Sequence, residues 1–412
     1  CGDTNITDAP NSDFARLPKW NIGQPNANLQ KPNSGTNGTL NYNNGNVAFA
    51  KGKYQANATA TYEEVGIIQI QKNDINDFLG KQVNLCSPYI GRFVPDHFQV
   101  QTPLLDHRSK LFDCSDIFTY LDEQWSLEFD LVAKNLNNAT TQNYINDFVK
   151  INITNRTYDG TNKKGVLNFA AVHNPSNSTI YVPFKSLTDR LKITAIDGSF
   201  TQGTAEIDLN GTIHRNSTVG PDGPFDDFSI GFKPIDEDNA TMLGTPDMNS
   251  TLKVAGNDTY ELARGDIRYG RATVENAYGS ELLPLTNIEL RAEYYNGSTF
   301  RTNKIDNCTG YNAANINWGN AEYGGNLSDI YLDSNGGGTL EQGVGKFAIH
   351  NASNPAEGPG KTGYVDYRFP VPSWLRFDWN DNGTRNNPSA RATFGIYKGN
   401  EHIIYQQETT WK

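Results

Sequence analysis

A short segment, Asp378-Trp379-Asn380-Asp381-Asn382-Gly383, has the spacing of oxygen-bearing side chains that is typical of a calcium-binding loop. Asp378, Asn380 and Asn382 alternate, so their side-chain oxygens can face one hard cation, while the glycine permits a sharp turn. An EF-hand is excluded, because Ser389 stands where that motif requires a glutamate. Two of the three side chains are neutral amides, so the sequence favours an Asx-rich turn between two strands, with a Ca²⁺ site at Asp378, Asn380 and Asn382 as the alternative.

The common motifs of metal-dependent hydrolases, serine hydrolases and phosphate-binding loops do not occur in the sequence. The chain has neither H-E-x-x-H nor G-x-S-x-G, and Gly343-Val344-Gly345-Lys346 is not a phosphate-binding loop, because Leu340 replaces the first glycine. Carboxylates are plentiful, with 46 Asp and Glu, and a pair for glycoside hydrolysis would come from distant strands. We therefore expect a protein that is not an enzyme, with a secreted carbohydrate-active hydrolase as the least favoured interpretation.

The four cysteines favour disulfides over metal binding. None lies in a C-x-x-C motif, which argues against zinc and thioredoxin-type sites. We predict a Cys86–Cys114 disulfide, because the two lie 28 positions apart and bracket a strand-rich segment. Cys1 and Cys308 are then left to pair with each other, unless Cys1 is lipidated as in a mature bacterial lipoprotein. Disulfides are typical of exported proteins.

Asparagine-linked glycosylation sequons are the second indication of export. The chain contains 17 of them, more than twice the number that random placement of its Asn, Ser and Thr would give. The alternative is that these residue types share loops because all three favour turns. The predicted acceptors are Asn5, Asn37, Asn57, Asn138, Asn152, Asn155, Asn177, Asn210, Asn216, Asn239, Asn249, Asn257, Asn296, Asn307, Asn326, Asn351 and Asn382.

Charge and hydropathy exclude several partners. The net charge is −11, whereas binding to nucleic acid or to an anionic leaflet needs clustered Lys and Arg. The apolar runs are too short for a membrane-spanning segment. The chain has 20 Tyr, 20 Phe and 6 Trp, which supply more aromatic surface than a disordered chain carries.

The alternation of apolar and polar residues, interrupted by turn signals, predicts many short β-strands. Residues from Trp125 to Ala133 alternate with period two, as do Ile288, Leu290, Ala292 and Tyr294. Asn296-Gly297 predicts a hairpin, and Arg391–Tyr397 with Glu401–Gln407 predicts another around Lys398-Gly399-Asn400. Weak helical character is confined to Ser115–Asp122 and Asn143–Val149.

We therefore predict an all-β fold of two to three Ig-like β-sandwich domains with long Asn- and Gly-rich loops. The predicted divisions are an N-terminal extended or β segment at 1–88, a sandwich at 89–262 and a C-terminal sandwich at 263–412.

Several motifs in order along the chain carry a resemblance to a known family. They are Tyr62-Glu63-Glu64-Val65-Gly66, Gly91-Arg92-Phe93-Val94-Pro95-Asp96-His97-Phe98, Cys114 before Phe118-Thr119-Tyr120, Asn143-Tyr144, Arg268-Tyr269-Gly270-Arg271, Asn276-Ala277-Tyr278-Gly279-Ser280-Glu281-Leu282, Asn307-Cys308-Thr309 and Pro388-Ser389-Ala390-Arg391-Ala392-Thr393-Phe394-Gly395. From about residue 50 onward the chain resembles the C-terminal region of MshQ-type proteins, which are encoded with the mannose-sensitive haemagglutinin, a type IV pilus. The resemblance implies an exported protein associated with a pilus or cell surface.

The sequence as a whole predicts an extracellular, glycosylated, non-catalytic adhesin-like protein of the cell surface. The alternative is a structural subunit of an extracellular filament. We expect its partners to be other surface or pilus proteins, copies of itself, or host and environmental glycans.

Overall fold

The computed structural model describes residues 20–43, 45–50, 56–78, 81–108, 114–158, 162–173, 185–216, 220–246, 259–324, 330–332, 336–351 and 361–395. The chain divides into two compact units. The N-terminal unit comprises Cys1–Asp106, Trp125–Ile213 and Asp227–Gly265, and the C-terminal unit comprises His107–Gln124, His214–Asp226 and Asp266–Lys412.

The N-terminal unit begins with small antiparallel sheets. One sheet has the order β2-β6-β7, with β8 also paired to β6, and two further pairs are β1 with β4 and β3 with β5. The strands are β1 Trp20–Gly23, β2 Asn26–Lys31, β3 Leu40–Tyr42, β4 Val47–Phe49, β5 Ala60–Tyr62, β6 Gly66–Phe78, β7 Lys81–Cys86 and β8 Ile90–Phe93.

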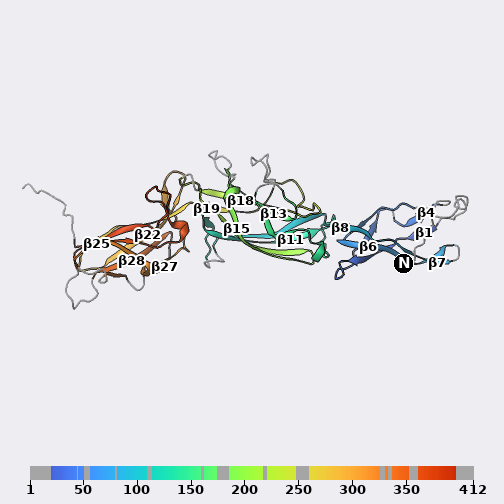
Figure 1. Ribbon diagram of the computed structural model, residues 1–412, viewed down its shortest axis with the longest axis horizontal. Coiled ribbons are helices and arrows are strands. Elements are labelled where there is room, and N and C mark those ends of the chain that lie inside the picture. Colours follow the sequence, from blue (N-terminus) through green and yellow to red (C-terminus); the bar gives the residue numbers. More distant parts are fainter. Residues whose placement is uncertain are drawn as a thin grey trace, which may run out of the picture. The chain divides into compact units, whose positions relative to one another are not determined.

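Two larger sheets form a sandwich in the same unit (Figure 1). One has the order β15-β17-β11-β9 with β16 on β17, and the other contains β19-β18-β13-β12 with β14 on β13. Phe129 on β11 meets Phe232 on β18 with ring centroids 5.0 Å apart, so the sheets share a core. The elements are β9 His97–Asp106, β11 Gln124–Lys134, η3 Asn146–Phe148, β12 Asn152–Thr157, β13 Val166–His173, β14 Lys185–Ser186, η4 Thr188–Arg190, β15 Leu191–Asp197, β16 Phe200–Thr201, β17 Thr204–Ile213, β18 Phe225–Ile235 and β19 Tyr260–Arg268.

The C-terminal unit is a second sandwich. Its sheets have the orders β20-β22-β28-β26, with β23 on β22, and β21-β30-β29-β25, and β24 pairs with β27. Side chains from both sheets, including Leu290, Phe347, Val365 and Phe394, form one buried core. The elements are β20 Gly270–Val274, β21 Ala277–Gly279, β22 Leu285–Tyr295, β23 Phe300–Thr302, β24 Gly310–Asn312, η6 Ala313–Asn315, β25 Asn317–Tyr323, β26 Ile330–Leu332, β27 Gly337–Thr339, β28 Val344–Asn351, β29 Gly363–Arg368, η9 Ser373–Leu375 and β30 Ser389–Phe394.

The short segment 107–124 folds with the C-terminal unit although it lies early in the sequence. Within it β10, Phe118–Tyr120, pairs in parallel with Asp266–Arg268 at the end of β19. Phe118 and Tyr120 are fully buried in the core that Leu290 and Phe394 also line. The predicted divisions at 88/89 and 262/263 place segment 107–124 in the middle sandwich. Its place in the C-terminal unit depends on pairing with residues that are distant in the sequence.

The all-β prediction is confirmed, since the described residues contain strands and short 3₁₀ segments but no α-helix. The alternating segment at Trp125–Ala133 is β11, and the Asn296-Gly297 hairpin joins β22 to β23, with Tyr295 opposite Phe300. The helical interpretation of Ser115–Asp122 is wrong, because β10 is paired in a sheet. Of the last predicted hairpin, β30 forms and Glu401–Gln407 lies outside the described residues.

Among the residues described, none belongs to a helix that has the length and apolar character needed to cross a bilayer.

Candidate functional sites

The C-terminal unit contains a buried cluster of charged side chains around Arg108, which is 1% exposed. The guanidinium nitrogens lie 2.9 Å from carboxylate oxygens of Asp116, Glu123 and Asp306. One of them also donates to the hydroxyl of Thr309 at 2.8 Å. A buried cation that holds several carboxylates cannot be removed without leaving unpaired charge, so this cluster anchors segment 107–124 in the unit.

Burial in this cluster shifts the pKa of Glu123. One carboxylate oxygen accepts the backbone N–H of Tyr120 at 2.9 Å. Burial raises the pKa of Glu123 to about 7, against the opposing charge of Arg108 and with a further rise from Asp306. Because the folded state holds this proton more tightly than the unfolded chain, the resulting stabilisation is fully present below pH 4.5 and is lost as the pH rises through about 7.

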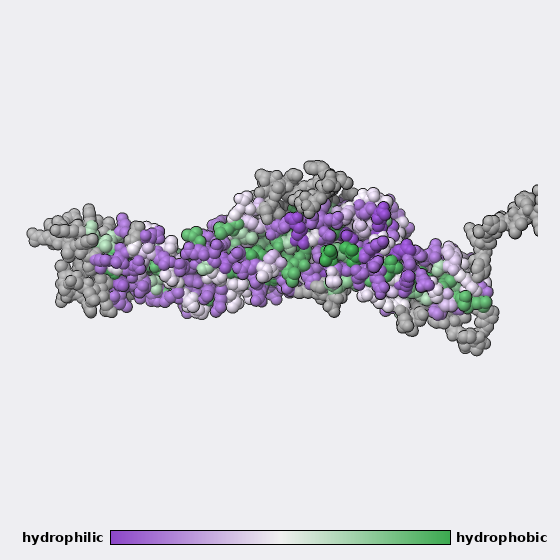
Figure 2. All heavy atoms as spheres, turned by 180° about the vertical axis from the view of Figure 1, so that it is seen from behind, coloured by the Kyte–Doolittle hydropathy of each residue, from purple (hydrophilic) through white to green (hydrophobic). Residues whose placement is uncertain are grey.

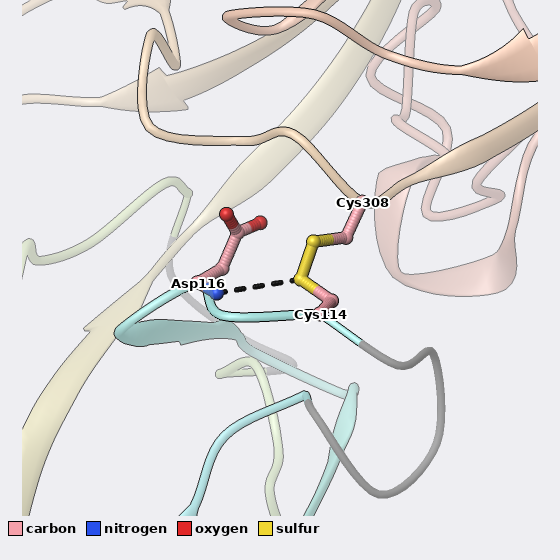
Figure 3. A group of neighbouring side chains, drawn as sticks. All are labelled: Cys114, Asp116 and Cys308. Carbon is pink, nitrogen blue, oxygen red and sulfur yellow. Dashed lines mark hydrogen bonds between the residues drawn. A yellow bond between two sulfur atoms is a disulfide. The ribbon is translucent and has the colours of Figure 1, made fainter.

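A disulfide joins Cys114 to Cys308, which are 194 positions apart in the sequence (Figure 3). The predicted Cys86–Cys114 pairing is therefore wrong. Cys114 belongs to the exchanged segment of the C-terminal unit, whereas Cys86 ends β7 in the N-terminal unit. Cys86 is itself disulfide-bonded, and Cys1 lies outside the described residues.

The disulfide also explains a cluster with metal-ligand geometry. Cys114, Asp116 and Cys308 are the one group of His, Cys, Asp and Glu in the described part of the chain whose ligand atoms lie close enough to hold a metal ion. Figure 3 shows the backbone N–H of Asp116 directed at the sulfur of Cys114, 3.3 Å away. Sulfur binds metals as thiolate, so the oxidised pair cannot serve as two ligands.

The candidate calcium loop forms a hydrogen-bonded turn. The two carboxylate oxygens of Asp378 accept the N–H groups of Asn382 at 3.1 Å and Gly383 at 2.6 Å. Burial acts to raise the pKa of Asp378, but these N–H groups outweigh it and the pKa is lowered. The side-chain oxygen of Asn382 accepts the N–H of Thr384 at 2.9 Å. This geometry is that of an Asx-rich turn, and Ca²⁺ at Asp378, Asn380 and Asn382 stays a prediction.

The structure separates the predicted glycosylation sites by exposure. Asn351 is 8% exposed and its side-chain amide donates to the carbonyl of Lys361 at 2.8 Å, so we exclude it as an acceptor. The exposed acceptors are Asn37, Asn57, Asn138, Asn152, Asn155, Asn239, Asn307 and Asn382, and the half-buried ones are Asn210, Asn216 and Asn296. Asn5, Asn177, Asn249, Asn257 and Asn326 lie outside the described residues.

The face that Figure 2 shows is mostly hydrophilic, with hydrophobic residues in small groups between polar ones. Single exposed hydrophobic side chains, such as Leu104 and Leu136, are normal on a protein surface. Among the described residues, two of the hollows that are large enough to hold a ligand are polar grooves.

A groove of about 1000 Å³ lies over one sheet of the N-terminal unit and is lined by carboxylates. Glu128 and Asp130 come from β11, and Glu206 and Asp208 come from β17. Each pair occupies alternate positions, which face the same side of the sheet. Such a row is expected on a solvated sheet face and does not by itself define a ligand site.

A second groove, of about 710 Å³, lies over the β21-β30-β29-β25 sheet of the C-terminal unit. We call it the β29 groove, and its lining includes Tyr278, Asn317, Trp318, Asp366, Arg368 and Arg391. It combines an exposed aromatic ring, side-chain amides and charged groups in one open, polar surface.

An ion pair organises the middle of the β29 groove. Asp366 and Arg391 lie opposite each other on β29 and β30. The Nε and a terminal nitrogen of Arg391 donate to the two oxygens of Asp366 at 2.6 and 3.1 Å, and the guanidinium lies 3.8 Å from the ring centroid of Tyr364. Because the two charges are paired, the neighbouring side chains supply the groups that remain available to a ligand.

Comparison with protein families gives two matches along the chain. The model of the third domain of DUF6701 matches residues 64–263, and that of the fourth domain matches residues 268–409. The chain belongs to the DUF6701 family. A search of the curated proteins finds no match.

The disulfide joins residues from both family matches, although both cysteines belong to the C-terminal unit of the structure. Cys114 falls in the stretch matched by the third-domain model and Cys308 in the stretch matched by the fourth. The β29 groove lies entirely within the fourth-domain match. Sequence reasoning missed this groove and the Arg108 cluster. The outward positions 364, 366 and 368 of β29 could have indicated the groove, because they alternate with buried residues.

Proposed function

We propose that this DUF6701 protein is an exported, non-catalytic, adhesin-like protein of the cell surface. The observation that carries the proposal is the oxidation state of its cysteines. Cys86, Cys114 and Cys308, the cysteines that the structure describes, are all disulfide-bonded. Disulfides form and persist in oxidising compartments and are rare in the cytosol.

The resemblance to MshQ-type proteins supports a pilus-associated location. Its motifs are distributed over both stretches matched by DUF6701 domain models, from Val65-Gly66 to Thr393-Phe394-Gly395. The exposed sequons support glycosylation as a further expectation. A rigid all-β scaffold with a polar groove is suited to presenting a binding surface outside the cell.

The test is made on intact cells that express the full-length protein. We expect surface-applied antibody to label the protein, added protease to cleave it, and deletion of its gene to reduce attachment of the cells to a substratum. A cytosolic enzyme serves as the control for lysis. Protein that is protected from protease until the cells are broken would overturn the proposal.

The hydrolase alternative is tested on the acidic groove of the N-terminal unit. The purified protein is incubated with polysaccharides and the release of reducing ends is measured. We expect no release above a heat-denatured sample. Release that a Glu128→Gln or Glu206→Gln substitution abolishes would instead favour a hydrolase.

A further inference from the structure

We infer that the β29 groove binds an acidic oligosaccharide, one that carries a carboxylate on its sugar ring. The inference rests on the proposed adhesin-like function and names the ligand class of its binding surface. It is carried by three features of the groove: an exposed aromatic ring, unpaired amides and one uncompensated cation.

The exposed ring is that of Tyr278 on β21, which is 68% exposed. An exposed large aromatic side chain beside a groove offers a flat, electron-rich face to a ligand. One face of a pyranose ring presents C–H groups, which carry partial positive charge and pack on such a face. Trp318 on β25 lies opposite the inward-facing Tyr367 and packs against the core, with the two ring centroids 6.4 Å apart. Tyr278, on edge strand β21, is therefore the aromatic ring that the groove offers to a ligand.

Side-chain amides supply the polar contacts. Asn317 and Asn320 on β25 are exposed, and among the described residues their side chains have no hydrogen-bond partner. Each amide offers a donor and an acceptor side by side, which matches a sugar hydroxyl that both donates and accepts. Asn276 is different, because its oxygen already accepts the N–H of Arg391 at 2.8 Å.

The charge of the groove selects an anionic sugar. Asp366 neutralises Arg391, so this pair contributes no net charge. Arg368 lines the same groove, is exposed, and has no ion-pair partner in the part of the chain that the structure describes. A guanidinium binds a carboxylate through two parallel hydrogen bonds. One free cation in a protein of net charge −11 favours a sugar with a single carboxylate at this position.

The geometry places the polar groups of the groove in register across the sheet. Arg368 pairs with Asn317 on one side and with Ser389 on the other, so cation, amide and hydroxyl form one row. Tyr278 lies in a different row, beside Thr393, and is two strands away from Arg368 and four residues further along. With about 3.3 Å per residue and about 4.8 Å per strand, the two side chains start about 16 Å apart, so an oligosaccharide of about three units or more that lies diagonally on the sheet would meet both.

The experiment titrates the full chain with a short galacto-oligosaccharide that carries a single galacturonate unit, and with the neutral galacto-oligosaccharide of the same length, by isothermal titration calorimetry. We expect the uronate to bind and the neutral sugar to bind at least tenfold more weakly, since the neutral sugar lacks the charge-assisted hydrogen bonds to Arg368. Arg368→Gln should weaken uronate binding about tenfold and leave the neutral sugar unchanged. Tyr278→Ala should weaken both.

Two matched variants control for charge and for aromatic surface. Arg301→Gln removes an exposed arginine from β23, which belongs to the opposite sheet, and Tyr89→Ala removes a tyrosine that is 69% exposed in the N-terminal unit. Both should bind as the wild type does. Equal uronate affinity in the wild type and Arg368→Gln, or no binding of either sugar, would overturn the inference. Surface location and attachment are measured in separate experiments, so a negative result in the sugar titration leaves the proposed function standing.

Discussion

Removal of the Cys114–Cys308 disulfide should destabilise the C-terminal unit and leave the N-terminal unit unchanged. The change is the double substitution Cys114→Ala, Cys308→Ala, in which both sulfurs are lost and no free thiol remains. Both cysteines are buried, at 8% and 9% exposure, so the substitutions leave little new polar surface. The main effect is on the unfolded chain, which gains conformational freedom when the cross-link is absent.

The magnitude depends on how much of the chain unfolds. For global unfolding the bond closes a loop of 194 positions, which corresponds to about 5 kcal/mol in the chain-entropy description. If only the C-terminal unit unfolds, the free path runs from Cys114 to Gln124 and from Asp266 to Cys308. That path is about 50 residues, and the loss is then about 4 kcal/mol. Either value is a large part of the net stability of a domain.

Hydrogen exchange measured by mass spectrometry resolves the two units. We expect amides of β22 and β28 to lose about 4 kcal/mol of protection and those of β11 and β17 to change little. Arg301→Gln, an exposed substitution in the same unit, should leave both sets unchanged. A loss below about 1 kcal/mol in β22, or an equal loss in β11, would refute the reasoning.

Three further predictions concern stability. Between pH 4.5 and about 7 the wild type should lose about 3 kcal/mol through Glu123, and urea denaturation of Glu123→Gln should show a correspondingly flatter pH dependence. Truncation after Asn387 removes β30 from the middle of its sheet, so circular dichroism should show the C-terminal unit unfolded and the N-terminal unit folded. Gly211→Ala should cost about 1–3 kcal/mol, because the added methyl group would overlap the indole of Trp125.

Each of these has an outcome that would contradict it. An unaltered pH slope in Glu123→Gln would show that the buried carboxyl is not the titrating group. A truncated chain that stays folded but no longer assembles on a sizing column would favour the filament alternative over the adhesin. A fully stable Gly211→Ala would show that the indole has room to move, and an exposed glycine with no neighbour within 4 Å, Gly220, supplies the matched control.

Strands with one buried face were predictable from the sequence. Ile288, Leu290 and Ala292 are 4%, 2% and 0% exposed on β22, as their period-two spacing predicts. In β10, by contrast, all three residues are buried. A strand covered on both faces shows no alternation, which is why segment 115–122 resembled a weak helix.

The cysteine pairing and the candidate groove could not be predicted from local spacing. Cys114 meets Cys308 because the chain exchanges segment 107–124 between units, and no local pattern encodes that exchange. The β29 groove gathers Tyr278, Asn317 and Arg368 from three strands. Their outward direction follows from alternation along each strand, but their proximity follows from sheet order, which depends on long-range pairing.

The central claim, an exported and disulfide-bonded surface protein, is tested most directly by surface biotinylation of intact cells followed by non-reducing peptide mapping. We predict that the protein is recovered in the biotinylated fraction with the peptide of Cys114 joined to that of Cys308. Recovery only from broken cells, with Cys114 and Cys308 as free thiols, would contradict the account.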